Sequence, residues 1–320
     1  MNNSKYPFVD FGSMPEYAIE VENLVKRYKS VTAVDNISFK VKKGELFAFL
    51  GPNGAGKTTT VEIIETIRKP TSGLVRVLGL DVMKNKIEIV HKIGVLPQEF
   101  SSFDNITVWE TVNYYSKLFG MKADVDKLIE LVNLSDKRNE RYKNLSGGLK
   151  QRLGIAISLV NDPEVVFLDE PTTGLDPRAR REVWSVLHGL KKEGKTIFLT
   201  THYMEEAELL ADTVAIISKG KIIAAGSPNE LIDKNTKYMI VTLKNPDKKI
   251  PEMLCKMGCE FENSNRDVKI KVERNEEILT ILNKLKEENI NYNGLDVRKP
   301  NLEEVFLNLT GEILHEEAKA

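Results

Sequence analysis

The pattern of apolar and polar positions near the start of the chain predicts strands first and then a helix. Residues 18–24 and 37–41 alternate between apolar and polar side chains, which indicates two antiparallel strands with one buried face. Residues 46–50 are apolar throughout, as in a strand that is buried on both faces. Helical spacing of apolar residues follows over residues 58–68. This part of the chain is therefore predicted to contain a strand–loop–helix unit preceded by antiparallel strands.

The middle of the chain predicts a helical insert followed by a parallel sheet. Apolar side chains recur at helical spacing within residues 107–142, so we expect a helical subdomain over about residues 100–160. Residues 165–168, 197–200 and 214–218 form short apolar runs with helical stretches between them. This alternation is typical of a sheet of parallel strands covered by helices. The expected class is α/β.

The pattern changes again after residue 233, where Lys, Glu and Asn become frequent and the apolar runs become short. The expected elements follow a β-α-β-β-α-β order, which predicts a small α+β domain of the ferredoxin-like type. A last helix with one apolar face is expected over residues 301–309. We therefore predict a flexible leader at residues 1–17, a large α/β domain at 18–233 and an α+β accessory domain at 234–320.

Composition and charge exclude several function classes. Hydrophobic residues make up 41% and charged residues 29% of the chain, so wholesale disorder is not expected. The net charge of -1 gives no excess of cations for a nucleic-acid backbone, and no nucleic-acid partner is expected. No apolar stretch approaches the roughly 20 residues that span a bilayer, and residues 1–16 lack the apolar core of a signal peptide. A cytoplasmic location is therefore expected.

A glycine-rich loop lies between the buried strand and the helix that follows it. The loop consists of Gly51, Pro52, Asn53, Gly54, Ala55, Gly56, Lys57, Thr58 and Thr59. This spacing is that of a phosphate-binding loop, whose glycines let the backbone wrap closely around a phosphate. We expect Lys57 to reach the β and γ phosphates of a nucleotide and the Thr58 hydroxyl to ligate Mg²⁺. The alternative is a chance glycine-rich turn, but the flanking strand and helix argue against it.

Two adjacent carboxylates end the apolar run at residues 165–168. Asp169 and Glu170 are expected at the carboxyl edge of the sheet, beside the phosphate loop, where ligands of such sheets bind. Asp169 is predicted to hold Mg²⁺ through water, and Glu170 to polarise the water that attacks the nucleotide. The alternative for such a pair is a solvated loop, but the phosphate loop upstream favours a hydrolase.

A second cradle of phosphate size is predicted at residues 145–152. Ser146, Gly147 and Gly148 open a helix there, so backbone N–H groups and a hydroxyl would face an anion at the positive end of the helix dipole. A chain with two such cradles is expected to work in pairs.

Taken in order, these motifs resemble the nucleotide-binding subunit of an ABC transporter, over about residues 18–231. The resemblance implies a P-loop NTPase fold of the ABC ATPase type that binds ATP and Mg²⁺. It implies that Tyr28 stacks on adenine and that Gln98 touches the metal and the water. It also implies that Asp176 lies in a loop that crosses to the partner subunit, and that His202 contacts the γ phosphate. From the residues alone, Tyr28 is a surface tyrosine at a strand end and Asp176 caps the helix after it.

Two further features concern the branch of this family. Leu149 occupies the position at which the commonest family signature has Gln. An apolar residue at this position resembles the signature of one exporter branch. Residues 300–311 resemble the closing motif of ABC-2 type export ATPases, a group that includes drug-resistance exporters. Both features favour an export ATPase.

The resemblance implies an ATPase subunit that dimerises around two Mg-ATP, as a homodimer or with a relative, and drives an integral membrane permease. Each site would combine the phosphate loop of one chain with Ser146 and Gly148 of the other. The subunit would lie at the inner face of the cell membrane, attached through the permease. The alternative is a soluble ABC ATPase that acts on ribosomes or nucleic acid. Such proteins usually carry two cassettes or a long coiled coil, and this sequence has neither.

Overall fold

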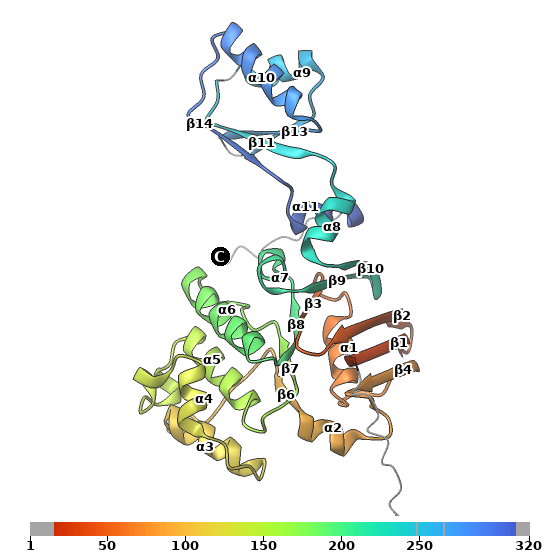
Figure 1. Cartoon of the computed structure of the whole chain (residues 1–320), viewed down its shortest axis with the longest axis vertical. Helices are drawn as coiled ribbons and strands as arrows, with labels where there is room; N and C mark the ends of the chain where they lie inside the picture. The colour runs from red at the N-terminus through yellow and green to blue at the C-terminus, as the bar shows by residue number, and fades with distance from the viewer. Residues whose placement is uncertain (1–15, 248, 265, 312–320) are drawn as a thin grey trace, which may run out of the picture. The chain divides into compact units, whose positions relative to one another are not determined.

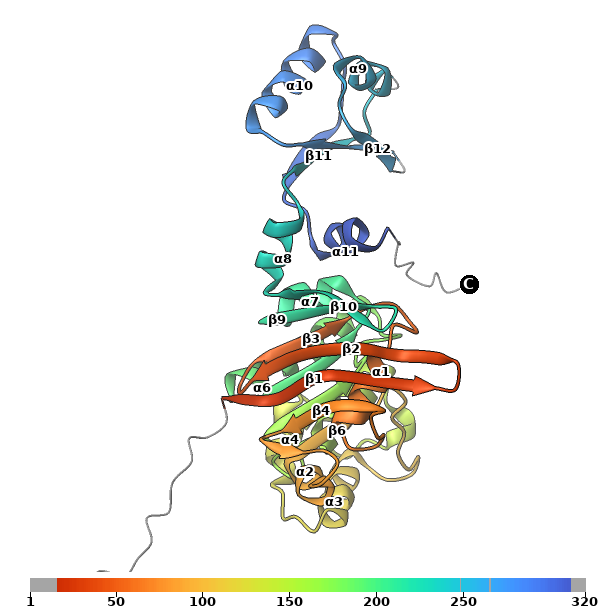
Figure 2. The same ribbon diagram turned by 90° about the vertical axis from the view of Figure 1, so that its right-hand side faces the viewer.

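The computed structural model describes residues 16–247, 249–264 and 266–311. The chain divides into two compact units, residues 1–225 and 226–320. Figures 1 and 2 show an α/β arrangement in the first unit and a smaller α+β arrangement in the second. The expected α/β class with a core parallel sheet is confirmed. Most of the predicted leader, residues 1–15, lies outside the described residues.

An antiparallel sheet of the first unit has the strand order β2-β1-β4-β5. Figure 2 shows β2, β1 and β4 side by side in this order. Its strands are β1 (Tyr17–Tyr28), β2 (Val31–Lys42), β4 (Ser72–Val77) and β5 (Leu80–Asp81). The predicted alternation in β1 and β2 turns Ile19, Val21 and Phe39 toward a shared core. The long β1–β2 hairpin ends where Tyr28 pairs with Val31.

The core sheet of the first unit has six strands in the order β10-β9-β3-β8-β7-β6. They are β3 (Leu46–Leu50), β6 (Ile93–Leu96), β7 (Val165–Asp169), β8 (Thr196–Thr201), β9 (Thr213–Ser218) and β10 (Lys221–Gly226). The neighbours from β9 to β6 pair in parallel. Every residue of β3, β7 and β8 is buried, because both faces of the sheet are covered. Their carboxyl ends therefore meet at one edge.

Helices surround this sheet, and three of them form the predicted helical insert. They are α1 (Lys57–Ile64), α2 (Lys86–Lys92), α3 (Val108–Leu118), α4 (Val125–Leu131), α5 (Gly147–Ser158), α6 (Pro177–Lys192) and α7 (Met204–Leu210), with short 3-10 turns at Ser135–Lys137 and Tyr142–Asn144. Val112 of α3, Ile129 of α4 and Leu153 of α5 share one core. The helix predicted over residues 58–68 ends early, because Thr66 has a φ of 66°, which helical backbone does not allow.

The second unit contains α8 (Pro228–Asn235), β11 (Met239–Lys244), α9 (Ile250–Met257), β12 (Phe261–Ser264), β13 (Asp267–Val272), α10 (Asn275–Glu287), β14 (Gly294–Arg298) and α11 (Leu302–Thr310). Its antiparallel sheet has the order β12-β13-β11-β14, and the predicted β-α-β-β-α-β succession is confirmed. Helix α8 packs against α11. The chain divides into its two compact units before α8, at Gly226, whereas the sequence predicts a domain boundary between residues 233 and 234.

Candidate active site

The glycine-rich loop forms a cradle at the carboxyl end of β3. Gly54 and Gly56 have φ angles of 79° and 106°, which side-chain-bearing residues rarely adopt. A Cβ atom at Gly51 would collide with the carbonyl of Ile217, and one at Gly56 with the carbonyl of Ala33. Close packing therefore excludes a side chain at Gly51 and Gly56, and the positive φ favours glycine at Gly54.

The Lys57 ammonium lies inside this cradle. Only 4% of the residue is exposed, and Nζ donates to the carbonyl oxygens of Gly51 at 2.8 Å and Pro52 at 3.3 Å. The same nitrogen lies 3.0 Å from Oε1 of Glu170. A phosphate held by the loop would therefore face a poorly solvated positive charge, where electrostatic attraction is stronger than in water.

Asp169, the last residue of β7, and Glu170, which follows it, are buried carboxyl groups whose pKa values are shifted in opposite directions. Burial raises the pKa of Asp169, although the Thr200 hydroxyl donates to its carboxylate. Burial also acts to raise the pKa of Glu170, but the His202 hydrogen bond and the Lys57 ammonium outweigh it and lower that pKa to about 2. Glu170 is therefore ionised at neutral pH. Such a separation of neighbouring pKa values is typical of catalytic sites.

Three side chains converge on Oε2 of Glu170. His202 Nδ1 lies 3.0 Å away, the Thr173 hydroxyl donates at 3.1 Å and the Gln98 amide at 3.5 Å. Glu170 has a φ of 48°, which is uncommon for a residue with a side chain. The Thr200 hydroxyl accepts a hydrogen bond from the Glu170 N–H at 3.0 Å and supports this conformation. The loop after β7 thus places the Glu170 carboxylate next to His202, which follows the end of β8.

The predicted second cradle lies at the start of α5, apart from the glycine-rich loop. Ser146 precedes the helix, and its side chain makes no capping hydrogen bond to it. A Cβ atom on Gly148 would lie 2.7 Å from Cβ of Ala179, so α5 packs closely on α6 at this point. Strands β6 to β8 lie between α5 and α1 (Figure 1). The two cradles of one chain therefore do not face a common ligand.

Tyr28 and Asp176 have contacts of their own. Tyr28 is 36% exposed, with the Lys26 ammonium 4.9 Å and the Arg68 guanidinium 5.7 Å from the ring centre. Asp176 accepts hydrogen bonds from two N–H groups in the first turn of α6, at 2.9 and 3.0 Å, and these bonds lower its pKa. The capping role predicted for Asp176 is confirmed, whereas its role toward a partner subunit stays a prediction.

Sequence reasoning missed three polar residues near the two carboxylates: Thr173, Thr200 and Glu65. Thr200 is detectable in principle, because it ends a predicted strand two residues before His202. Glu65 carries no such signal in the sequence. Its environment includes Asp169, which lies far from it along the chain. It is 6% exposed, and its pKa is raised to about 8 by burial and by the charges of Asp169 and Glu62.

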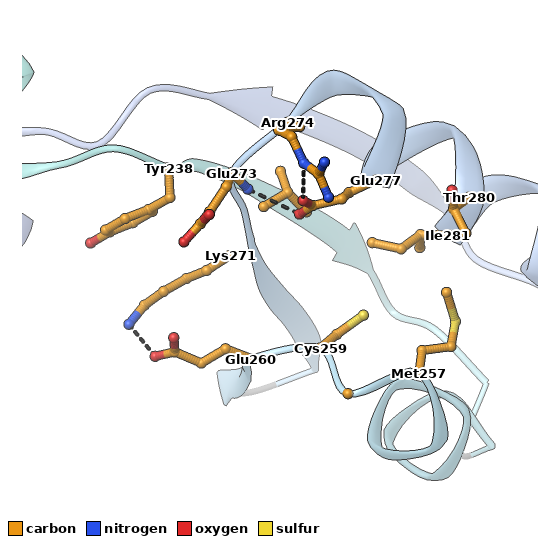
Figure 3. Close-up of a pocket in the computed structure, with 12 residues that line it drawn as sticks. Tyr238, Met257, Cys259, Glu260, Lys271, Glu273, Arg274, Glu277, Thr280 and Ile281 are labelled. Atoms are coloured by element: carbon orange, nitrogen blue, oxygen red, sulfur yellow. Dashed lines mark hydrogen bonds and ion pairs between the residues drawn. The ribbon is translucent and has the colours of Figure 1, made fainter.

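A cleft of about 470 Å³ in the second unit is a weaker candidate for a site (Figure 3). The Lys271 ammonium in this cleft donates a hydrogen bond to the Glu260 carboxylate. Arg274 Nε donates to Oε1 of Glu277 at 3.1 Å, so both cations are paired with carboxylates. Burial raises the pKa of the Cys259 thiol at its edge, which makes the thiol a poor nucleophile. The chemistry therefore concentrates in the first unit.

Comparisons with known proteins identify relatives of this chain. Residues 34–173 match the family model for the ABC transporter domain. The chain is 37% identical to the Nod factor export ATP-binding protein I of Ralstonia nicotianae, over 97% of this chain and 98% of that protein. It is 33% identical to the linearmycin resistance ATP-binding protein LnrL of Bacillus subtilis, over 93% and 100%.

A solved structure is also similar, namely a dimeric ATP-binding cassette in a post-hydrolysis state with bound ADP and Pi. It is 26% identical, with a TM-score of 0.59, and the match covers 65% of this chain and 98% of that one. No helix in the described part of the chain is long and apolar enough to cross a membrane.

Proposed function

The chain belongs to the family of ABC transporter ATP-binding proteins, and from this premise we propose that two copies close around two Mg-ATP and drive export through a separate membrane permease. As a member of this family, the chain binds and hydrolyses ATP. The observation that carries the proposal is the convergence of Lys57 and His202 on Glu170 at the carboxyl edge of the core sheet.

The residues of the cradle fit a magnesium nucleotide. The backbone of the loop and the Lys57 ammonium would hold the β and γ phosphates. The Thr58 hydroxyl donates to Oδ2 of Asp169 at 3.4 Å, so two oxygen ligands of the kind that Mg²⁺ prefers lie together. Gln98 would add its amide oxygen. Bound Mg²⁺ would neutralise charge on the phosphates during transfer.

Glu170 and His202 would act on the water and the γ phosphate. A pKa of about 2 keeps Glu170 ionised, so its carboxylate would accept a hydrogen bond from water and orient it. Phosphoryl transfer depends mainly on positioning and charge stabilisation, and it does not require a strong base. His202 holds the Glu170 carboxylate through Nδ1 and would present its other ring nitrogen to the γ phosphate.

A second copy would complete each site. The Ser146 side chain does not cap its own helix, and it would face the phosphates held by the other chain, together with the N–H groups of Gly147 and Gly148. Asp176 would cross toward the partner from the start of α6. The half-exposed ring of Tyr28 would stack on adenine. The dimeric state of the solved cassette with ADP and Pi supports this arrangement.

The direction of transport is inferred from the relatives. The two similar proteins are named for Nod factor export and for linearmycin resistance. We therefore assign the chain to an export system, in which the permease would hold it at the inner face of the membrane. The permease would contact the substrate, and this chain would supply the free energy of ATP hydrolysis.

The variant Glu170→Gln tests the proposal. Removing the carboxylate is expected to lower ATP hydrolysis at least about 100-fold, because water is no longer polarised, while ATP still binds. Mg-ATP should then trap a dimer of twice the 36.2 kDa chain mass, measured by light scattering after size exclusion. Glu193→Gln changes an exposed glutamate after α6 and should behave like the natural protein. Normal turnover by Glu170→Gln, or failure to dimerise with ATP, would contradict the proposal.

A further inference from the structure

Glu206 is a fully buried carboxyl group to which the proposed mechanism gives no role. It lies in α7 and has no exposed surface. Its Oε1 accepts hydrogen bonds from the Thr172 hydroxyl at 2.9 Å and from the Trp184 indole N–H at 2.9 Å. Its Oε2 is buried without a hydrogen-bond partner among the described residues. Because burying a carboxyl group is costly, packing alone does not explain a glutamate at this position.

The two hydrogen-bond donors come from different elements around the active site. Thr172 lies in the loop of residues 170–176, which connects β7 with α6. Trp184 lies in α6 itself, eight residues after the capping Asp176. Helix α7, which carries Glu206, begins two residues after His202. One carboxylate oxygen therefore joins the loop that follows β7 to the two helices α6 and α7.

These contacts close a ring that contains both proposed reacting groups. Thr173, the neighbour of Thr172, donates to Oε2 of Glu170 at 3.1 Å. His202 Nδ1 lies 3.0 Å from the same oxygen. The ring runs from Glu170 through Thr173 and Thr172 to Glu206, and returns along the backbone of α7 to His202. A displacement of the Thr172–Glu206 contact would therefore move the Glu170 carboxylate relative to the imidazole.

We propose that Glu206 is a positioning residue, which fixes the 170–176 loop against α7 and thereby holds Glu170 and His202 in the arrangement required for hydrolysis. This inference rests on the roles proposed for those two residues. The phosphate cradle is built from a different segment, the loop before α1, so ATP binding does not depend on the Glu206 contacts. Misplacement of a reacting group by about 1 Å costs up to about 100-fold in rate. Loss of the contacts is therefore expected to change kcat and not KM.

Two substitutions of Thr172 separate positioning from packing. Thr172→Val keeps the shape of the side chain and removes the hydroxyl, whereas Thr172→Ser keeps the hydroxyl. In the full-length chain we expect Thr172→Val to lower kcat for ATP at least about tenfold, with KM within about twofold. Thr172→Ser should keep most of the natural kcat. A purely structural role would lower thermal stability in Thr172→Val without changing kcat of the folded protein.

Variants of Glu206 give an independent comparison. The amide oxygen of Glu206→Gln still accepts from both donors, so its kcat is expected to stay within about threefold of the natural value. Glu206→Leu has a similar volume and accepts no hydrogen bond, so it should lose activity as Thr172→Val does. Glu205→Gln, at the exposed neighbouring position, is the matched control. If Glu206→Leu does not fold, the Thr172 pair decides the question.

The outcomes also separate this inference from the proposed function. Normal kcat in Thr172→Val, or a raised KM with unchanged kcat, would overturn the positioning role. Glu170→Gln is measured in the same assay. If Glu170→Gln is inactive while Thr172→Val and Glu206→Leu hydrolyse normally, only the positioning role is wrong. If Glu170→Gln hydrolyses normally, the proposed function fails and the positioning role fails with it.

Discussion

At the residue scale, the active site is defined by buried carboxyl groups with different neighbours. Glu170 faces the Lys57 ammonium and the His202 ring, and its pKa falls to about 2. Glu65 is buried near the negative charge of Asp169, and its pKa rises to about 8. At neutral pH the first group is ionised and the second is mostly protonated. Burial has the same direction of effect on both, so the local cations decide the difference.

The raised pKa of Glu65 predicts how stability changes with pH. Its pKa is about 8 in the folded chain against an ordinary value of 4.5, so the folded state binds more protons between these values. The free energy of unfolding therefore falls as the pH rises through this window. Glu65→Gln removes the titration. We expect this variant to exceed the natural protein in stability by roughly 3 to 5 kcal/mol at pH 9, and to match it near pH 4.5.

Urea unfolding at the two pH values measures this difference. Glu88→Gln, at an exposed position of α2, is the control and should leave the pH dependence unchanged. A Glu65→Gln variant whose stability differs from that of the natural protein by the same amount at both pH values would contradict the shifted pKa.

At the scale of elements, strands made of continuous apolar residues were predictable from the sequence. The ends of elements that depend on tertiary contacts were not. The apolar run at residues 46–50 matches the observed bounds of β3. Strands β4 and β6 were not predicted, because each is short and gains its character from pairing with β1 or β7. The end of α1 depends on the left-handed conformation of Thr66, which apolar spacing does not indicate.

The close packing of α5 on α6 predicts a compensating pair of substitutions. A Cβ atom added in Gly148→Ala would lie 2.7 Å from Cβ of Ala179, so the helices must separate. We expect the single variant to lose about 1 to 3 kcal/mol of stability through overpacking. Ala179→Gly removes the opposing methyl group, so the double variant should recover most of this loss. Chemical denaturation of the four proteins gives the coupling energy, and additive effects of the two substitutions would contradict the contact.

At the scale of the whole molecule, the chain consists of two units with separate cores. The core of the second unit includes Val241, Ile270 and Ile281, and all the proposed nucleotide residues lie in the first unit. The β-α-β-β-α-β order of the second unit was predictable because the apolar positions of its elements keep the spacing of strands and helices. Helix α8 packs on α11, which lies far along the chain, and apolar spacing does not indicate such a contact.

This division predicts that ATP stabilises one unit selectively. A ligand at 100 times its Kd adds about 2.7 kcal/mol to the stability of the unit that binds it. In calorimetry of Glu170→Gln we expect two unfolding transitions, and Mg-ATP should raise only one of them, by about 5 °C or more. Lys57→Ala, combined with Glu170→Gln, should abolish the shift. Equal shifts of both transitions, or one cooperative transition, would contradict independent units.

In the proposed function, each nucleotide site is shared by two copies of the chain. Ser146 is exposed, so Ser146→Arg alters the second cradle without disturbing the core. Ser135→Arg, at an exposed position in a 3-10 turn, is the matched control. The decisive measurement is the molar mass in Mg-ATP, with each arginine substitution introduced into Glu170→Gln. We predict a dimer for Glu170→Gln alone and with Ser135→Arg, and a monomer that still binds ATP with Ser146→Arg. A dimer of the Ser146→Arg double variant, or its loss of ATP binding, would contradict the claim.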